Sequence, residues 1–372
     1  MIYLDYSATT PPCKKAIVCF ERESERRYGN PNSLHAFGME ARLEIESSTK
    51  KIKKILGNEN CEIIYTSGAT EANNMAIMGT AIKKQKQGKH VITTSEEHPS
   101  VTACFSRLVK MGYEVDIIEA KKDGRIDPEE LESLVRPDTI LVSVVNVNSE
   151  IGSVNDIERI GNILKKYSQV TFHSDMTQAI GKIRLPKYYP DLFTFSGHKI
   201  YGLKGIGCLV RNDKTVLEPI LYGGASVSAY RPGTPPEPLI VSFAAALEDA
   251  YSKFLLKEKK IAKLNRILIE GLESLDGVLL NSPDDAIGQI INFSFPLLKA
   301  PVLQKRLSDR GIFVSTQSAC CFEKTYSRLI NLLFGDMDRA ESSIRVSISH
   351  LTSDRDIRTF LDVLAMEIES CR

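Results

Sequence analysis

The chain has 372 residues, which is long for one compact core and suits two domains. Its 48 basic and 47 acidic residues leave a net charge of +1, so the composition indicates neither a nucleic acid nor a membrane as a main partner. No apolar run approaches the roughly 20 residues that cross a bilayer. The N-terminus has no signal-peptide pattern, and none of the eight cysteines forms a Cys-x-x-Cys pair. We therefore expect free thiols, no metal site and a cytoplasmic location.

Short runs rich in apolar and β-branched residues alternate with helical patterns from about residue 60 onward. The predicted strands cover residues 62–66, 90–94, 114–119, 139–145, 169–173, 191–195 and 206–210. Helical patterns, among them residues 71–84 and 157–167, lie between several of these strands. This alternation predicts an α/β fold with a mostly parallel sheet and helices on both faces. A ligand is then expected in the crevice at the carboxyl ends of the strands.

The second half of the chain has a different order of elements. A loop rich in glycine and proline is predicted at 223–238, and one long helix from 239 to about 275 is predicted to link two domains. The elements predicted after it are a strand at 289–295, a helix at 301–310, a strand from 313, a further helix, a strand at 343–349 and a helix at 354–369. This order predicts a smaller α+β domain.

Lys199 follows directly after a predicted apolar strand, in the sequence Ser196-Gly197-His198-Lys199. A lysine in a partly desolvated crevice at a strand end can act as a nucleophile toward a carbonyl group. The alternative is a solvated surface lysine, which is the commonest state of this residue type. The segment alone does not decide between the two.

A second polar segment, which contains Gly68, Ala69 and Thr70, also follows a strand and opens a helix. Free backbone N–H groups at a helix start attract anions, so this segment predicts a phosphate site. The alternative is an ordinary helix start that Ser67 or Thr70 caps with its hydroxyl.

Two more strand ends carry an aspartate and a histidine. An ionised Asp175 can pair with a protonated pyridine nitrogen, which pyridoxal phosphate (PLP) needs if its ring is to store electrons, and Gln178 can donate to the ring oxygen. His98 can stack on a flat ring and move protons near neutral pH. The alternatives are a helix N-cap for Asp175 and a strand-end histidine without a special role for His98.

These four motifs occur together and in a fixed order along the chain. With residues 4–11 and 29–31, they resemble the class V aminotransferase family of fold-type I PLP enzymes, and within it the NifS/IscS-like cysteine desulfurases. The resemblance runs almost end to end. It implies a large PLP-binding domain, residues 15–255, built on a mostly parallel seven-stranded sheet. It also implies a smaller α+β domain, residues 1–14 and 256–372, which carries a catalytic cysteine loop.

The resemblance implies a role for each motif residue. PLP forms a Schiff base with Lys199, which also moves protons, and His98 stacks on the ring as a further catalytic residue. Thr234 reaches the phosphate bound in the partner subunit, which implies a homodimer with shared active sites. The residues implied to bind the cofactor are Ala69, Thr70, His98, Ser149, Asp175, Gln178, Ser196, His198, Lys199 and Thr234.

Cys320 stands where desulfurases carry a reactive cysteine after Ser-Ala. The resemblance implies that its thiolate attacks the sulfur of L-cysteine, which leaves L-alanine and a persulfide on Cys320. The sulfur then passes to an acceptor protein, such as an iron–sulfur scaffold or a tRNA thiolation enzyme. Arg345 matches the arginine that binds the substrate carboxylate, and Asn148 is also predicted to bind the substrate.

Several segments depart from the family pattern. The usual Asn-Asn-Glu is Asn148-Ser149-Glu150 here, the loop at 223–228 lacks a Glu-Arg pair, and residues 315–320 differ from Ser-Ser-Gly-Ser-Ala-Cys. These departures leave two alternatives open. One is a related PLP enzyme without thiol chemistry, such as a selenocysteine lyase or an aminotransferase. The other is a scaffold without turnover that binds partners through residues 315–325.

Overall fold

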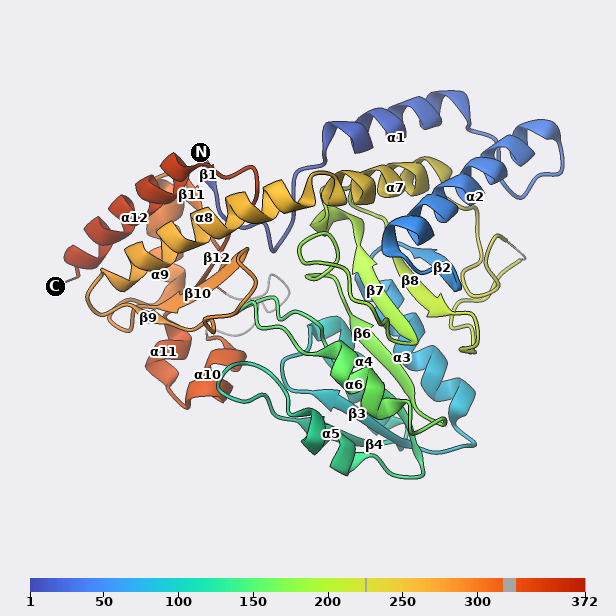
Figure 1. Cartoon of the computed structure of the whole chain (residues 1–372), viewed down its shortest axis with the longest axis horizontal. Helices are drawn as coiled ribbons and strands as arrows, with labels where there is room; N and C mark the ends of the chain where they lie inside the picture. The colour runs from blue at the N-terminus through green and yellow to red at the C-terminus, as the bar shows by residue number, and fades with distance from the viewer. Residues whose placement is uncertain (225, 317–325, 372) are drawn as a thin grey trace.

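The seven strands predicted between residues 60 and 212 form one sheet in the computed structural model, which describes residues 1–224, 226–316 and 326–371. The strand order is β2-β8-β7-β6-β5-β3-β4, and β8 runs in the direction opposite to the other six strands. The prediction of a mostly parallel sheet is therefore confirmed (Figure 1). The strand bounds are β2 Cys61–Thr66, β3 His90–Thr94, β4 Glu114–Ile118, β5 Thr139–Ser143, β6 Thr171–Asp175, β7 Leu192–Ser196 and β8 Gly207–Asn212.

Both faces of this sheet are covered by helices because alternate residues of each strand point to opposite faces. On one face, Ile64 and Leu209 pack with Met75 of a helix. On the other face, Phe193 and Phe195 join the main core cluster. The helices that surround the sheet are α1 Lys14–Arg26, α2 Ala36–Leu56, α3 Ala69–Lys84, α4 Pro99–Lys110, α5 Pro128–Leu134, α6 Ile157–Leu164 and α7 Glu237–Tyr251. We call this part of the molecule the large lobe.

A second hydrophobic cluster organises the other part of the molecule, which we call the small lobe. Leu4 from the N-terminal segment packs there with Leu264, Phe293 and Phe360. Its sheets are β12-β10-β9, which is antiparallel, and the parallel pair β1-β11. The bounds are β1 Ile2–Tyr3, β9 Leu279–Leu280, β10 Ile290–Ser294, β11 Ile312–Phe313, β12 Ser343–Ser347, α8 Phe254–Glu273, α9 Ala300–Asp309, α10 Arg328–Phe334, α11 Met337–Glu341 and α12 Asp354–Glu369.

The single long helix predicted from 239 to 275 is wrong. The chain forms α7 and α8 instead, and the two helices meet at Ser252 and Lys253. Ser252 is extended, and Lys253 has a φ of 52°, in the left-handed region that few residues other than glycine adopt. Figure 1 shows that α7 lies over the large lobe and α8 over the small lobe, so the break lies where the chain passes between them.

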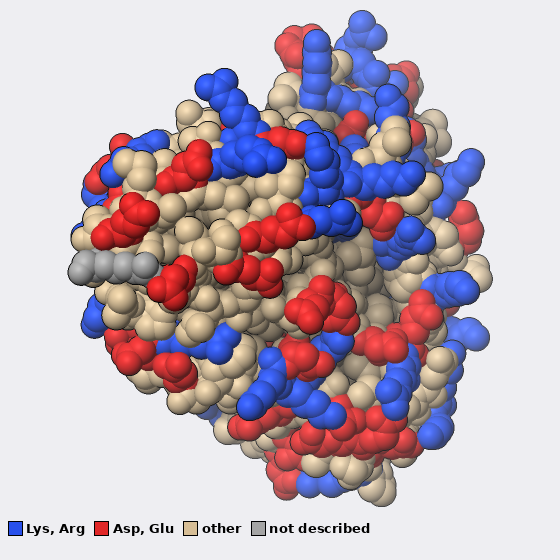
Figure 2. Space-filling view, turned by 60° about the vertical axis from the view of Figure 1, so that its left-hand side comes forward, with Lys and Arg blue, Asp and Glu red and all other residues tan. Residues whose placement is uncertain are grey.

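Acidic and basic side chains are interspersed over the face of the molecule in Figure 2, in keeping with the net charge of +1. Within the described residues, no helix combines the length and the apolar character that a membrane crossing needs.

Candidate active site

A cavity of about 700 Å³ lies where the carboxyl ends of β6 and β7 meet the starts of α3 and α4. Residues from the N-terminal segment and from β12 also line it, so both lobes contribute. The structure brings most of the predicted site residues together around this cavity. They are Ala69, Thr70, His98, Ser149, Asp175, Gln178, Ser196, His198, Lys199 and Arg345.

One end of the cavity is formed by the start of α3. Gly68 is the N-cap residue of α3, and no side chain caps the helix, so the alternative of capping by Ser67 or Thr70 is wrong. The turn is held by Thr66, whose hydroxyl donates to the Gly68 carbonyl over 2.9 Å. Gly207 of β8 must lack a side chain, because a Cβ there would lie 2.8 Å from the Gly68 Cα. The N-terminus of α3 is thus open toward the cavity and suits a phosphate.

Asp175 is buried at the end of β6, and both of its carboxylate oxygens accept hydrogen bonds. Oδ1 accepts from the Thr177 N–H over 2.9 Å, and Oδ2 accepts from Nδ2 of Asn73 over 2.8 Å. Asn73 lies on α3 and is fully buried. Sequence reasoning missed it, although its position three residues after Thr70 places it on the same helix face.

His98 is the N-cap residue of α4, and Pro99 opens the helix. Its Nδ1 accepts from the Ser100 N–H over 3.1 Å and lies 2.8 Å from the Ser100 hydroxyl. Burial lowers the pKa of His98, nearby Lys199 lowers it further, and Asp175 opposes the shift. The imidazole is therefore neutral near pH 7.

Lys199 ends a short 3₁₀ turn, Gly197–Lys199, that follows β7. Its Nζ donates to the carbonyl oxygens of Ser7 and Ala8 over 2.6 and 2.7 Å. Gln178 also donates to the Ser7 carbonyl, over 2.9 Å. The N-terminal segment thus orients two predicted cofactor residues, a role that sequence reasoning did not assign to it.

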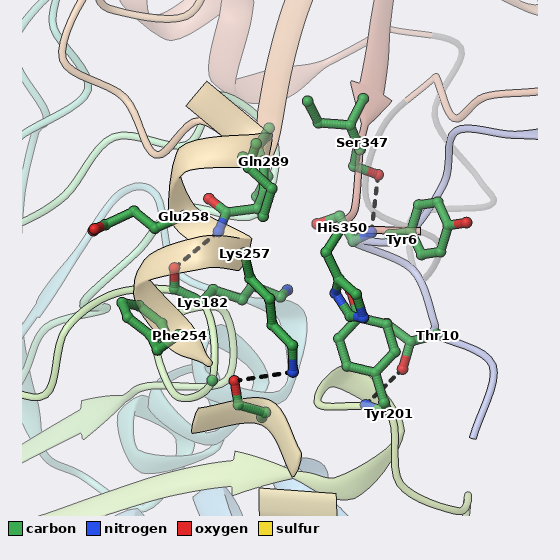
Figure 3. Close-up of a pocket in the computed structure, with 16 residues that line it drawn as sticks. Tyr6, Thr10, Lys182, Tyr201, Phe254, Lys257, Glu258, Gln289, Ser347 and His350 are labelled. Atoms are coloured by element: carbon green, nitrogen blue, oxygen red, sulfur yellow. Dashed lines mark hydrogen bonds between the residues drawn. The ribbon is translucent and has the colours of Figure 1, made fainter. Parts of the chain in front are cut away.

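A second cavity, of about 30 Å³, lies between the lobes and shares Ser7 with the first (Figure 3). Nζ of Lys182 at this cavity donates to the Gln178 side-chain oxygen, and the Lys182 carbonyl accepts from Gln289 of the small lobe over 2.8 Å. Desolvation, and then the charges of Lys199 and Arg345, hold the Lys182 pKa well below its usual value. Gln178 is thereby linked to the small lobe.

Ser196 lies beside the open end of α3, where a Cβ on Gly68 would be 3.6 Å from its Oγ, and His198 lines the same cavity. Nδ1 of His198 is 3.1 Å from the Thr9 hydroxyl, and the His198 carbonyl accepts from the Thr10 hydroxyl over 2.9 Å. Burial, followed by the charges of three nearby lysines, lowers the pKa of His198 to about 4. His198 therefore acts as a neutral hydrogen-bonding group here.

Arg345 enters the cavity from β12, and its guanidinium group is almost fully buried. Nη2 pairs with Asp5 over 2.9 Å, and Nη1 donates to the Ser149 carbonyl over 3.0 Å. Nε has no hydrogen-bond partner among the described residues. Because a buried donor without a partner is costly, this atom suggests that the site receives a further acceptor.

Glu96 also lines the cavity, and sequence reasoning gave it no role. Burial raises the pKa of its carboxyl group to about 7, although Nδ2 of Asn155 donates to it over 3.1 Å. The adjacent Glu97 is buried too, and its pKa is raised well above the usual range, first by burial and then by the charges of Asp175 and Glu96.

Two predicted residues of the described part of the chain do not line the cavity. Asn148 is buried in a turn, where its Oδ1 accepts from the Glu150 N–H over 2.8 Å. Thr234 is exposed in the loop before α7. Cys320 lies outside the described residues.

Comparison with known proteins gives a consistent result. Residues 2–360 match the family model "Aminotransferase class-V". The chain is 35% identical to "Cysteine desulfurase IscS" of Dictyoglomus turgidum, over all of this chain and 95% of the relative. It is 38% identical to "Cysteine desulfurase, mitochondrial" of Arabidopsis thaliana, over all of this chain and 83% of the relative.

Solved structures agree with the sequence relatives. A "NIFS-LIKE PROTEIN" has a TM-score of 0.93 at 32% identity, with 99% of each chain covered. "SspA in complex with cysteine" has a TM-score of 0.83 at 29% identity and covers 95% of this chain and all of that chain. The family resemblance and the fold-type I prediction are confirmed, and the cofactor of this family is PLP. The chain therefore belongs to the class V aminotransferase family, and the relatives named above are cysteine desulfurases and NifS-like proteins.

Proposed function

We propose that the chain is a PLP-dependent cysteine desulfurase, which converts L-cysteine to L-alanine and forms a persulfide on Cys320. The observation that carries this proposal is the set of Lys199, Asp175 and His98 around one cavity that Arg345 enters from the other lobe. The full-length relatives named as cysteine desulfurases support it.

The cavity fits PLP in size and in chemistry. Its volume of about 700 Å³ lies within the usual range for small-molecule sites. The open start of α3, with Ser196 and His198, would hold the phosphate, and the buried Asp175 would pair with the pyridine nitrogen. Gln178 and Ser149 line the same cavity and would face the ring oxygen, while His98 would stack on the ring. When bound, PLP supplies a ring that stores the electron pair left on the substrate carbon.

Lys199 would hold the cofactor covalently and take the proton from the substrate Cα on its Nζ. Among its partners are the carbonyl oxygens of Ser7 and Ala8, two residues that line the same cavity. A general base must come within hydrogen-bonding reach of the proton it removes, and Lys199, which lines the cavity from the turn after β7, would be placed for this role.

Arg345 would bind the substrate carboxylate. A guanidinium group can donate two parallel hydrogen bonds to a carboxylate, and its Nε has no partner in the described part of the chain. In the present arrangement Asp5 is the carboxylate that pairs with Arg345. A substrate carboxylate would therefore share or replace this contact.

Cys320 would be the sulfur-accepting nucleophile. Ser315 pairs with Arg345 through two backbone hydrogen bonds of 2.7 and 3.1 Å, and the Ser327 hydroxyl donates to Glu150, next to Ser149, over 2.7 Å. Since five residues span at most about 17 Å, Cys320 is tethered within that distance of Ser315. In the step, an S–S bond forms between Cys320 Sγ and the substrate sulfur, and the substrate Cβ–S bond breaks. Its electron pair stays on carbon, which takes up a proton to become the methyl group of alanine.

A homodimer with shared sites is part of this proposal. Apolar side chains on α1, α2 and the segment between them are exposed, with Leu34 at 91%, Leu43 at 61% and Met39 at 53%. Exposed apolar patches are typical of subunit interfaces. Thr234 is exposed and lies apart from the cavity of its own chain, so it is free to reach the site of the partner subunit.

The domain bounds, the compartment and the acceptor complete the proposal. Residues 15–255 would form the large domain, and residues 1–14 and 256–372 the small domain. The compartment would be a reducing cytoplasm, in which thiols such as that of Cys320 stay free. The persulfide would pass to an iron–sulfur scaffold or a tRNA thiolation protein, without direct contact with nucleic acid.

The test is an assay of alanine and sulfide from L-cysteine, with PLP and a thiol reductant. Cys320→Ala should lose both products, whereas Cys371→Ala should retain them. Undiminished product from Cys320→Ala, or transamination that does not need Cys320, would favour a related PLP enzyme without thiol chemistry. A purified chain that shows no PLP absorbance even with added PLP would favour the scaffold.

A further inference from the structure

Asn73 is a fully buried polar side chain that lies behind the cofactor side of the cavity. Its Nδ2 donates to Asp175 Oδ2 over 2.8 Å and to the Ser100 hydroxyl oxygen over 2.9 Å. Its Oδ1 accepts from the Thr194 hydroxyl over 2.6 Å. One carboxamide thus connects three elements: β6, which ends at Asp175, β7, which precedes the turn that ends at Lys199, and α4, whose N-cap is His98.

The orientation of this carboxamide is fixed by Asp175. An ionised carboxylate can only accept hydrogen bonds, so the NH₂ group of Asn73 must face it. The reversed amide would bring Oδ1 against the carboxylate oxygen and leave two buried acceptors without a donor. The second N–H of Nδ2 is therefore directed at Ser100 and not away from it.

The direction of the next hydrogen bond follows. The Ser100 oxygen accepts from Asn73, so its own hydrogen is available for Nδ1 of His98, 2.8 Å away. The Ser100 backbone N–H also donates to Nδ1, over 3.1 Å. A backbone N–H cannot accept, so Nδ1 carries no proton and the neutral ring holds its proton on Nε2.

We propose that Asn73 is a positioning residue that couples Asp175 to His98: it directs the hydroxyl hydrogen of Ser100 at Nδ1 and thereby supports the neutral ring, protonated on Nε2, against protonation of Nδ1. An imidazolium form would carry a proton on Nδ1, opposite two donors. The charged groups that act on His98 are Asp175 of β6, which favours protonation, and Lys199 of the 3₁₀ turn, which disfavours it. Burial also lowers its pKa, in agreement with this assignment.

The inference rests on the proposed function in one respect, the cofactor ring on which His98 would stack. With Asp175 paired to a protonated ring nitrogen, a second positive charge on the stacked imidazole would be repelled. The relay through Asn73 and Ser100 would oppose that charge, because the same Asp175 that pairs with the ring nitrogen also sets the orientation of the relay.

The experiment is nitrogen NMR of the full-length chain labelled on histidine, with and without added PLP. The spectrum of His98→Gln assigns the His98 signals among the six histidines. We expect the wild-type chain to show the Nε2–H tautomer. Asn73→Ala keeps the Ser100 backbone donor and should retain the tautomer, but it no longer orients the Ser100 hydroxyl toward Nδ1 and should raise the His98 pKa by about one unit, the size expected for one lost hydrogen bond. The matched control is Asn74→Ala, because Asn74 contacts the Thr70 carbonyl instead, and it should leave both values unchanged.

Ser100→Ala provides a second route, because it removes the hydroxyl and keeps the backbone donor. We expect it to retain the tautomer and to raise the His98 pKa by less than Asn73→Ala. A wild-type proton on Nδ1, or an unchanged His98 signal in Ser100→Ala and Asn73→Ala, would overturn the inference. If Asn73→Ala does not fold, Ser100→Ala alone decides. The NMR signals of the chain without PLP do not depend on turnover. If the His98 tautomer is as expected but no alanine is released, the proposed function is contradicted and the inference on Asn73 is not.

Discussion

Asp175 and Arg345 face the same cavity from different lobes, but their hydrogen bonds are organised differently. On the large-lobe side, Asp175 accepts from Thr177 and Asn73, and Asn73 uses all of its own donors and its acceptor. On the small-lobe side, Arg345 pairs with Asp5 and Ser149 but keeps a buried Nε without a partner in the described residues. The difference indicates that the protein itself orients the cofactor side, whereas the substrate side has donor capacity left for a ligand.

The largest effect should come from the large-lobe side. Lys199→Ala removes both the covalent attachment point and the base, so alanine formation should fall by at least about 10⁴-fold. The PLP absorbance of the purified chain should also change, because the cofactor can then bind only non-covalently. Retained activity in Lys199→Ala would show that Lys199 neither holds the cofactor covalently nor acts as the base.

Arg345→Lys tests the small-lobe side. Lysine keeps the positive charge but loses the planar fork, and it leaves Asp5 with a poorer partner. We expect kcat/KM for L-cysteine to fall by about 10²-fold, mainly through KM, as for a damaged buried charge pair. Arg339→Lys is the control, since Arg339 contacts Asn281 and lies away from the cavity wall, and it should leave KM unchanged. A fall confined to kcat would contradict the assignment of Arg345 to carboxylate binding.

Glu96 lines the same cavity, and its effect on the stability of the fold should depend on pH. Its pKa is raised to about 7 in the fold, so the folded state holds the proton more tightly than the unfolded state. Its contribution to stability is present below about pH 4.5 and is lost as the pH rises through about 7. Glu96→Gln should therefore match the wild type near pH 4 and be more stable at pH 8, by up to about 3 kcal/mol.

Urea unfolding at the two pH values measures this difference, with the exposed Glu270→Gln as the control. An advantage of Glu96→Gln that is equal at both pH values would show that the gain does not come from the titration of Glu96.

The smallest expected effect concerns the junction between the lobes. Lys253 has a φ of 52°, a conformation that costs a residue with a Cβ about 1 kcal/mol more than glycine. Lys253→Gly also raises the backbone entropy of the unfolded state, which opposes this gain. The net stabilisation should therefore be at most about 1 kcal/mol. Thermal unfolding would measure it, and a marked destabilisation would show that the Lys253 side chain supports the junction.

The sequence predicted the parts of this molecule that have a local signature. Alternating apolar strands and helical patterns gave the seven-stranded sheet, and polar residues directly after strands gave Asp175, His98 and Lys199. Asn73 and Ser100 were missed because a polar residue inside a helix has no signature until the helix is packed against the sheet. The break at Lys253 was missed for a similar reason, since neither glycine nor proline marks it.

Limited turnover with L-cysteine tests the central claim most directly. The chain with bound PLP receives one equivalent of L-cysteine without reductant, and the released alanine and the mass of the peptide that contains Cys320 are measured together. The account predicts one alanine per protomer and a mass gain of one sulfur atom on the Cys320 peptide, both absent in Cys320→Ala. Alanine release without a modified Cys320 would contradict it.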